Sequence, residues 1–185
     1  PYTTLFRSQP FSYLHPLLGG RSDVTSADST PVLPFGHGLG YTTFERSGLE
    51  ADATVAAGGE FEARVTVRNT GERAGTDLVQ LYARDVFASV TRPVAQLLGY
   101  ARVSLEPGEE AVVALRVPTA RLAFTGRGGE RIVEPGDVEL WVGPSCAERE
   151  TATAIEITGP VHAVTPADGR LVAVEVSAPA PAPLA

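Results

Sequence analysis

Few side chains in this sequence could do chemistry. Asp and Glu total 22 residues, but most of them fall on the polar faces of predicted strands or in turns, as solvated acids commonly do. His37 could serve as a base or a metal ligand, although a single histidine between Gly36 and Gly38 more often packs or forms a hydrogen bond. The glycine-rich segment is no phosphate loop, because no lysine follows it and no strand-to-helix context surrounds it.

Two further residues have a possible chemical role. Cys146 is the only cysteine, so it can form neither an internal disulfide nor a multi-cysteine metal site, and we interpret it as an ordinary small residue at a strand end. Trp141, the only tryptophan, alternates with Leu140 and Val142 and therefore lies on the opposite face of its predicted strand. That position favours a sheet-edge or interdomain contact over a platform for a sugar ring.

The elements that would position these residues are strands. Residues 60–85 (EFEARVTVRNTGERAGTDLVQLYARD) contain two runs in which apolar and polar residues alternate, a period typical of half-buried β-strands. The inward residues are Phe61, Ala63, Val65 and Val67 in the first run and Val79, Leu81 and Ala83 in the second. Asn69 and the glycines after it tolerate positive φ, which predicts a chain reversal. The two strands are expected to be antiparallel neighbours or to cross from one sheet to another.

The same reasoning predicts short strands over much of the remaining chain. They cover residues 96–105, 110–117, 131–133, 137–142 and 151–157, with a short apolar piece at 122–124 and a weak strand at 171–176. Turns with Pro and Gly separate them, and no segment has the periodicity of an amphipathic helix. This pattern predicts an all-β fold, a two-sheet antiparallel sandwich with an irregular N-terminal extension and a disordered C-terminal tail.

Composition narrows the possible partners. The formal net charge of −7 argues against a nucleic-acid or anionic-membrane partner, which would need a basic patch. No apolar run is long enough to span a bilayer.

The start of the chain needs its own interpretation. Residues 1–8 (PYTTLFRS) match the in-frame translation of the end of a common sequencing-library adaptor, so we expect the native sequence to begin near Gln9. Residues 9–33 are rich in Pro, Gly, Ser and Thr and are predicted to be a connector. The Ala-Pro repeat near the C-terminus is predicted to be an extended tail.

In this order and spacing, the segments resemble the C-terminal end of bacterial glycoside hydrolase family 3 enzymes, the β-glucosidases and β-xylosidases. The resemblance rests on residues 33–44 (LPFGHGLGYTTF, with Gly40 where the family usually has Ser), 65–82, 90–94 (VTRPV), 96–100 (QLLGY), 105–109 (LEPGE) and 134–143. It covers about residues 9–158. It implies a division into residues 9–40, the end of an α/β sandwich domain and linker, 41–158, a fibronectin type III-like domain, and 159–185, a C-terminal extension.

The resemblance also implies a function. Family members hydrolyse terminal β-linked sugars with retention, using a carboxylate nucleophile and a second carboxyl group as the acid. Neither position lies in this chain, so we expect no catalytic residue and no cofactor or metal here, and we expect the chain alone to be inactive. The expected partners are the upstream catalytic domains of the parent chain, and the candidate interdomain packing residues are Phe35, His37, Tyr41 and Arg92. The sugar and the compartment stay open.

Two alternatives from other classes remain. A stand-alone carbohydrate-binding or adhesion module would need an exposed aromatic platform. An unrelated immunoglobulin-like structural domain would not require the PFGHGL and TRPV segments.

Overall fold

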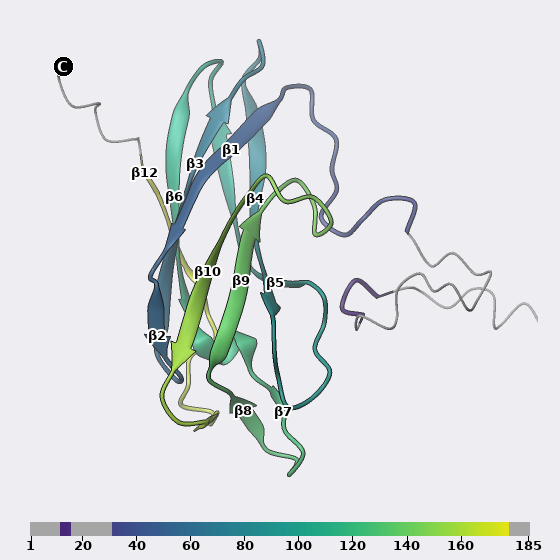
Figure 1. Cartoon of the computed structure of the whole chain (residues 1–185). Helices are drawn as coiled ribbons and strands as arrows, with labels where there is room; N and C mark the ends of the chain where they lie inside the picture. Colours follow the sequence, from purple (N-terminus) through teal and green to yellow (C-terminus); the bar gives the residue numbers. More distant parts are fainter. Residues whose placement is uncertain (1–11, 16–30, 178–185) are drawn as a thin grey trace, which may run out of the picture.

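The two alternating runs of residues 60–85 form long strands that lie in different sheets of a β-sandwich. The computed structural model describes residues 12–15 and 31–177 (Figure 1). Strand β3 (Glu60–Asn69) belongs to a four-stranded sheet and β4 (Gly75–Asp85) to a five-stranded one. Of the two predicted arrangements, the sheet-to-sheet crossing is therefore the one that occurs.

The four-stranded sheet has the order β1-β3-β6-β12 and is antiparallel throughout. Its other strands are β1 (Phe44–Ala51), β6 (Glu110–Pro118) and β12 (Ala173–Ser177). Strand β12, which the sequence predicted as a weak strand, pairs with β6 and forms one edge. Strand β1 was not predicted, because its glycine and charged residues break the alternation.

The five-stranded sheet has the order β2-β10-β9-β4-β5. It contains β2 (Thr54–Ala56), β10 (Thr151–Thr158), β9 (Gly136–Val142) and β5 (Gln96–Leu105) besides β4. One detail corrects the predicted all-antiparallel pairing: β2 runs parallel to β10. Strand β2 is an edge strand of this sheet, whereas the preceding strand, β1, lies in the other sheet. The short segment between β1 and β2 therefore carries the chain across the sandwich.

A small third sheet lies at one end of the sandwich, with the order β11-β8-β7. It consists of β11 (His162–Ala163), β8 (Arg131–Val133) and β7 (Phe124–Thr125), and a short 3₁₀ helix, η2 (Thr119–Leu122), precedes β7. The apolar piece predicted at 122–124 thus joins η2 to β7.

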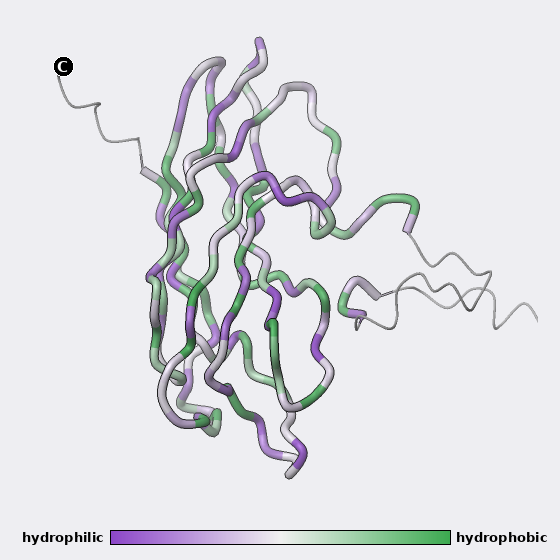
Figure 2. The backbone as a smooth tube through the Cα atoms, viewed as in Figure 1, coloured by the Kyte–Doolittle hydropathy of each residue, from purple (hydrophilic) through white to green (hydrophobic). Residues whose placement is uncertain are grey.

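The core lies between the two large sheets, and most of its residues are those that the alternation placed inward. Phe61, Val67, Val79, Leu81, Leu115, Val117, Leu140 and Val142 have no exposed surface. Figure 2 shows the alternation of apolar and polar residues along the strands. The predicted all-β, fibronectin type III-like sandwich is confirmed.

The loop after β3 reverses the chain in a different way from the one predicted. In the described residues every positive φ belongs to a glycine, and neither Asn69, Gly71 nor Gly75 has one. The side chain of Asn69 instead fixes the loop, because its amide donates hydrogen bonds to the carbonyl oxygens of Arg73 (2.8 Å) and Leu105 (3.0 Å). The positive-φ explanation was wrong, and a buried side-chain network replaces it.

Three expectations fall wholly or mostly outside the described residues: the adaptor origin of residues 1–8, the connector at 9–33, and the tail from residue 178 onward. Within the described part of the chain, no helix has the length and apolar character that crossing a membrane would require.

Candidate functional site: the outer face of the five-stranded sheet

The most unusual feature of the sandwich is a second apolar cluster outside the inter-sheet core. Tyr82 on β4 and Trp141 on β9 point outward and are register partners across the two strands. Together with Ala95, Leu97 and Cys146 they form what we call the outer cluster. Tyr82 has no exposed surface and Trp141 only 1%. An outward-facing residue of a solvent-exposed sheet would not be buried in this way.

Trp141 is enclosed by side chains. Its ring stacks on Tyr82 with centroids 5.7 Å apart, and the guanidinium of Arg149 lies 4.2 Å from the centroid of the same ring. Its indole Nε1 is buried and has no hydrogen-bond partner among the described residues. Of the two contacts predicted for Trp141, the sheet-edge contact is wrong, because β9 is the central strand of its sheet. The interdomain contact stays a prediction, and an open sugar platform does not fit a ring that is almost completely buried.

Residues 31–43, which we call the strap, cover part of the outer cluster. The carbonyl oxygen of Phe35 accepts hydrogen bonds from the backbone N–H of Cys146 (2.9 Å) and from the hydroxyl of Tyr82 (3.3 Å). The side-chain amide of Gln80 donates to the carbonyl oxygen of Gly36 (3.0 Å). The outward polar groups of β4 thus hold the strap by its backbone, and burial raises the pKa of the Tyr82 phenol.

Gly36 is necessary for this close approach. Its φ is +90°, and a Cβ placed there would lie 2.2 Å from the Tyr82 hydroxyl oxygen. Only glycine combines that backbone conformation with the required space. The PFGHG segment, singled out in the sequence for its glycines, is therefore a docking turn on the sheet.

Residues 12–15 pack beside the strap. The rings of Tyr13 and Phe35 stack with centroids 4.0 Å apart and planes 7° from parallel. The backbone N–H of Val94 donates to the carbonyl oxygen of His15 (3.0 Å). Two segments that precede the sandwich in sequence are thereby joined to its outer face.

The downstream end of the strap is fixed by the loop after β3. The hydroxyl of Thr42 donates to Oδ1 of Asn69 (2.9 Å), and the backbone N–H of Thr70 donates to the carbonyl oxygen of Thr43 (2.9 Å). Asn69 is fully buried, so this one amide holds both the loop and the strap.

Just beyond the strap, Arg46 on β1 ties the two sheets together. Its guanidinium donates to Asp77 on β4 through Nε (2.9 Å) and to Glu150 through Nη1 (3.0 Å). Arg46 and Asp77 are both buried, so the attraction between them is weakly screened.

On both sides of this docking turn, side chains of the strap point into solvent. Val32, Leu39 and Tyr41 are exposed to 99%, 94% and 95%, and His37 is also exposed. Phe35 is 44% exposed because one face stacks on Tyr13. Exposed apolar side chains of this kind are typical of a surface that contacts another protein part. The interdomain role expected for Phe35, His37 and Tyr41 stays a prediction.

Arg92 has a different environment from the other three candidates. It forms an ion pair with Asp85 (3.3 Å), donates through Nη2 to the carbonyl oxygen of Leu122 (2.6 Å) and lies 4.4 Å from the centroid of the Phe124 ring. Burial lowers the pKa of Arg92 and raises that of Asp85, while the attraction between them acts in the opposite direction. Its side chain is 9% exposed and joins the β4–β5 loop to η2 and β7 of the same domain.

A His–Asp pair lies in the C-terminal extension, away from the outer cluster. His162 Nε2 is 2.8 Å from Oδ1 of Asp168. Hydrogen bonds from the backbone and hydroxyl of Thr165, followed by that from His162, hold the pKa of Asp168 at about 2. These bonds fix the turn after β11. In the described residues no group of three or more His, Cys, Asp or Glu side chains is placed to hold a metal ion.

Sequence reasoning missed Gln80, Tyr82 and Arg149 as site residues. One signal was available: Tyr82 and Trp141 are both large aromatics at outward positions of predicted strands. Their pairing depends on the register between β4 and β9, which the alternation alone does not fix.

Comparison with known proteins identifies this architecture. The family profile described as fibronectin type III-like domain matches residues 77–146, which run from β4 through the β9–β10 loop. The chain carries a fibronectin type III-like domain. A putative β-xylosidase of Formosa agariphila is 33% identical over 140 residues, covering 75% of this chain and 18% of the relative. A periplasmic β-glucosidase of Salmonella typhimurium is 38% identical over 118 residues, covering 63% of this chain and 15% of the relative.

Solved structures show the same domain within much longer enzymes. A β-glucosidase from Erythrobacter marinus superposes with a TM-score of 0.72 at 37% identity, covering 79% of this chain and 19% of that one. A β-glucosidase from Listeria innocua in complex with glucose has the same TM-score at 27% identity, covering 80% and 22%. The chain thus spans about a fifth of the relatives it matches, and it corresponds to the fibronectin type III-like part of glycoside hydrolase family 3 enzymes.

Proposed function

We propose that this chain is the structural, C-terminal domain of a longer retaining β-glycosidase that acts on terminal β-linked sugars. In this proposal the domain packs on the catalytic part of the parent chain through the strap and the outer cluster. The nucleophile and the acid then come from the parent, and this domain stiffens the enzyme.

One observation carries the proposal: aromatic residues are buried outside the inter-sheet core, beneath a segment that presents apolar side chains to solvent. Tyr82 and Trp141 contribute nothing to holding the two sheets together, yet both are buried. The strap over them exposes Val32, Leu39 and Tyr41 almost completely. Burying those side chains against another domain would gain about 1.5–3 kcal/mol each.

A chimera tests the proposal. The matching segment of the Formosa agariphila β-xylosidase, which is 39% identical to this chain over 127 residues, is replaced by the corresponding residues of this chain. We expect the chimera to fold and to hydrolyse an aryl β-xyloside, and we expect an enzyme truncated before that segment to be insoluble or inactive. If the chimera performs no better than the truncated enzyme, the structural role is wrong.

The isolated chain provides the complementary measurement. We expect no turnover of aryl β-glucosides or β-xylosides by the purified chain, and measurable turnover that follows the chain through purification would contradict the proposal. In a pull-down on insoluble polysaccharide we expect no retention that depends on Trp141, because both Tyr82 and Arg149 cover its ring.

A further inference from the structure

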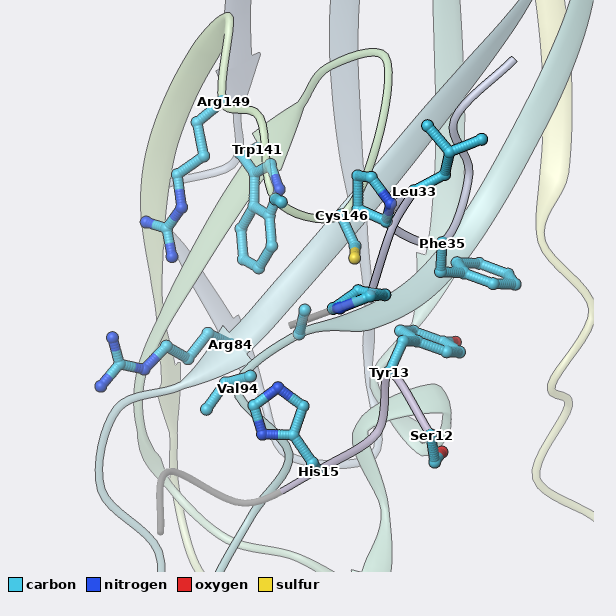
Figure 3. Close-up of a pocket in the computed structure, with 14 residues that line it drawn as sticks. Ser12, Tyr13, His15, Leu33, Phe35, Arg84, Val94, Trp141, Cys146 and Arg149 are labelled. Carbon is cyan, nitrogen blue, oxygen red and sulfur yellow. The ribbon is translucent and has the colours of Figure 1, made fainter. Parts of the chain in front are cut away.

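A cavity of about 630 Å³ opens between the outer cluster, the start of the strap and residues 12–15 (Figure 3). Its walls are mostly apolar, with Trp141, Phe35, Val94 and Ala95 among them. A volume of this size accommodates a side chain together with part of the backbone that carries it.

Positive charge is concentrated in the lining. Arg84 and Arg149 both contribute to it, and no Asp or Glu does, although the chain as a whole carries a formal charge of −7. Figure 3 shows the two guanidinium groups on the same side of the cavity.

The two guanidiniums share a single carboxylate. Glu139 Oε2 lies 3.2 Å from Nη1 of Arg149 and 3.9 Å from Nη1 of Arg84. Together, the two guanidiniums and the carboxylate carry one net positive charge. Arg149 is also held in place by stacking on Trp141, so less side-chain entropy would be lost when it binds an anion.

Trp141 also places a buried polar atom beside the cavity. Trp141 lines the cavity, and its buried Nε1–H has no acceptor among the described residues. Figure 3 shows this nitrogen on the side of the indole that faces Cys146. A buried donor without an acceptor costs about 1–3 kcal/mol. This nitrogen lies on the side of the ring away from the two guanidiniums, so the site for an anion is defined by Arg84 and Arg149.

We propose that this cavity receives an acidic side chain, Asp or Glu, from the part of the parent enzyme that packs on the domain, and that its carboxylate binds between Arg84 and Arg149. This inference rests on the proposed function, because it names the chemistry of the partner at the same surface. Guanidinium groups bind carboxylates with well-directed, charge-assisted hydrogen bonds, and the apolar walls suit the methylene groups of the incoming residue. Leu33 and Phe35 line the cavity and are also half-exposed, so it is continuous with the exposed part of the strap.

The carboxylate chemistry is testable on the chain as it stands. Because the chain has one tryptophan, its indole N–H gives a single NMR signal that reports on the cavity. The probes are N-acetylglutamate amide and its neutral analogue N-acetylglutamine amide, added at constant pH and ionic strength. We expect the glutamate probe to shift the signal saturably at millimolar concentrations, and the glutamine probe to shift it at least tenfold less effectively.

Three variants sharpen the titration. Arg149→Gln should weaken binding of the glutamate probe about tenfold. The control is Arg102→Gln, which changes an exposed residue of β5 outside the cavity and should leave the affinity of the probe unchanged. Glu139→Gln removes the competing carboxylate and should tighten binding a few-fold. Equal shifts from the acid and the amide, or an unchanged affinity in Arg149→Gln, would overturn the proposed carboxylate site.

The chimera separates this inference from the proposed function. Arg149→Gln should lower the melting temperature more in the active chimera than in the isolated chain, because the partner carboxylate is present only in the chimera. If the chimera folds and the two losses are equal, the acidic partner is wrong while the structural role stands. If the chimera fails to fold, the structural role falls, and the titration still decides whether the cavity binds a carboxylate.

Discussion

The two outer faces of this sandwich are built from strands of the same alternating pattern, yet their inner strands carry different outward residues. On the four-stranded sheet the outward residues form a ladder of ion pairs. Glu62 on β3 pairs with Arg64 of its own strand and with Arg116 on β6, and Arg68 pairs with Glu110. On the five-stranded sheet the outward positions hold Tyr82 and Trp141, both buried.

The difference shows that the stability of the sandwich constrains its inward residues and leaves its outward residues less constrained. A sandwich is stable once the inner faces of its two sheets are apolar, and the outward residues are then free to be polar. The ladder follows that rule, and its charged side chains remain largely solvated. The outer cluster departs from the rule, and the strap covers part of it.

The largest effect should come from removing the center of the covered face. Trp141→Ala deletes a fully enclosed ring, and we expect a loss of about 3–5 kcal/mol in the free energy of unfolding, measured by circular dichroism in urea. Val112→Ala, a half-buried residue of β6 on the ladder face, is the control and should cost about 1 kcal/mol or less. Equal losses would mean that the two faces are energetically alike.

A smaller effect should follow when the strap is lifted from the sheet. Gly36→Ala places a methyl group against the Tyr82 hydroxyl and strains the backbone, and we expect it to cost about 1–3 kcal/mol. The emission of Trp141 should shift to longer wavelength as its cover loosens. Gly38→Ala is a matched control, since a Cβ there has no atom within 4 Å and should change neither quantity. Identical behavior of the two variants would show that the strap does not protect the cluster.

The smallest effect belongs to the ladder. Hydrogen bonds from Arg116 and Arg64 lower the pKa of Glu62 below its ordinary value. A lowered folded-state pKa contributes stability that is present above the unfolded-state value of about 4.3 and is lost as the pH falls through the folded-state pKa. Glu62→Gln should therefore be slightly less stable than the wild type at neutral pH and equal to it at low pH.

High salt, like low pH, should reduce the stability difference between the wild type and Glu62→Gln. Exposed ion pairs are screened, so the small difference between wild type and Glu62→Gln should shrink in high salt. Urea unfolding midpoints across pH and salt measure this, and a difference that persists at pH 2 would contradict the ion-pair explanation.

Sequence reasoning found the long strands and their inward residues because these depend on local alternation. The predicted strand at 96–105 coincides with β5, and the inward residues of β3, β6 and β9 are those of the core. It missed β1 and β2, where the apolar face is too sparse to show a period. It also assigned the reversal after β3 to positive φ, since a local pattern does not reveal that the Asn69 side chain binds the strap and the carbonyl of Leu105.

The sequence by itself determined an all-β sandwich, its inner faces, and a resemblance specific enough to name the enzyme family of its relatives. Only the tertiary structure decided which outer face is covered, because that depends on how strands distant in sequence are placed side by side. The register of β4 and β9 brings Tyr82 beside Trp141, and the loop before β10 sets Arg149 over the same ring. Tyr82 and Trp141 are about sixty positions apart in the sequence, and no local periodicity encodes their contact.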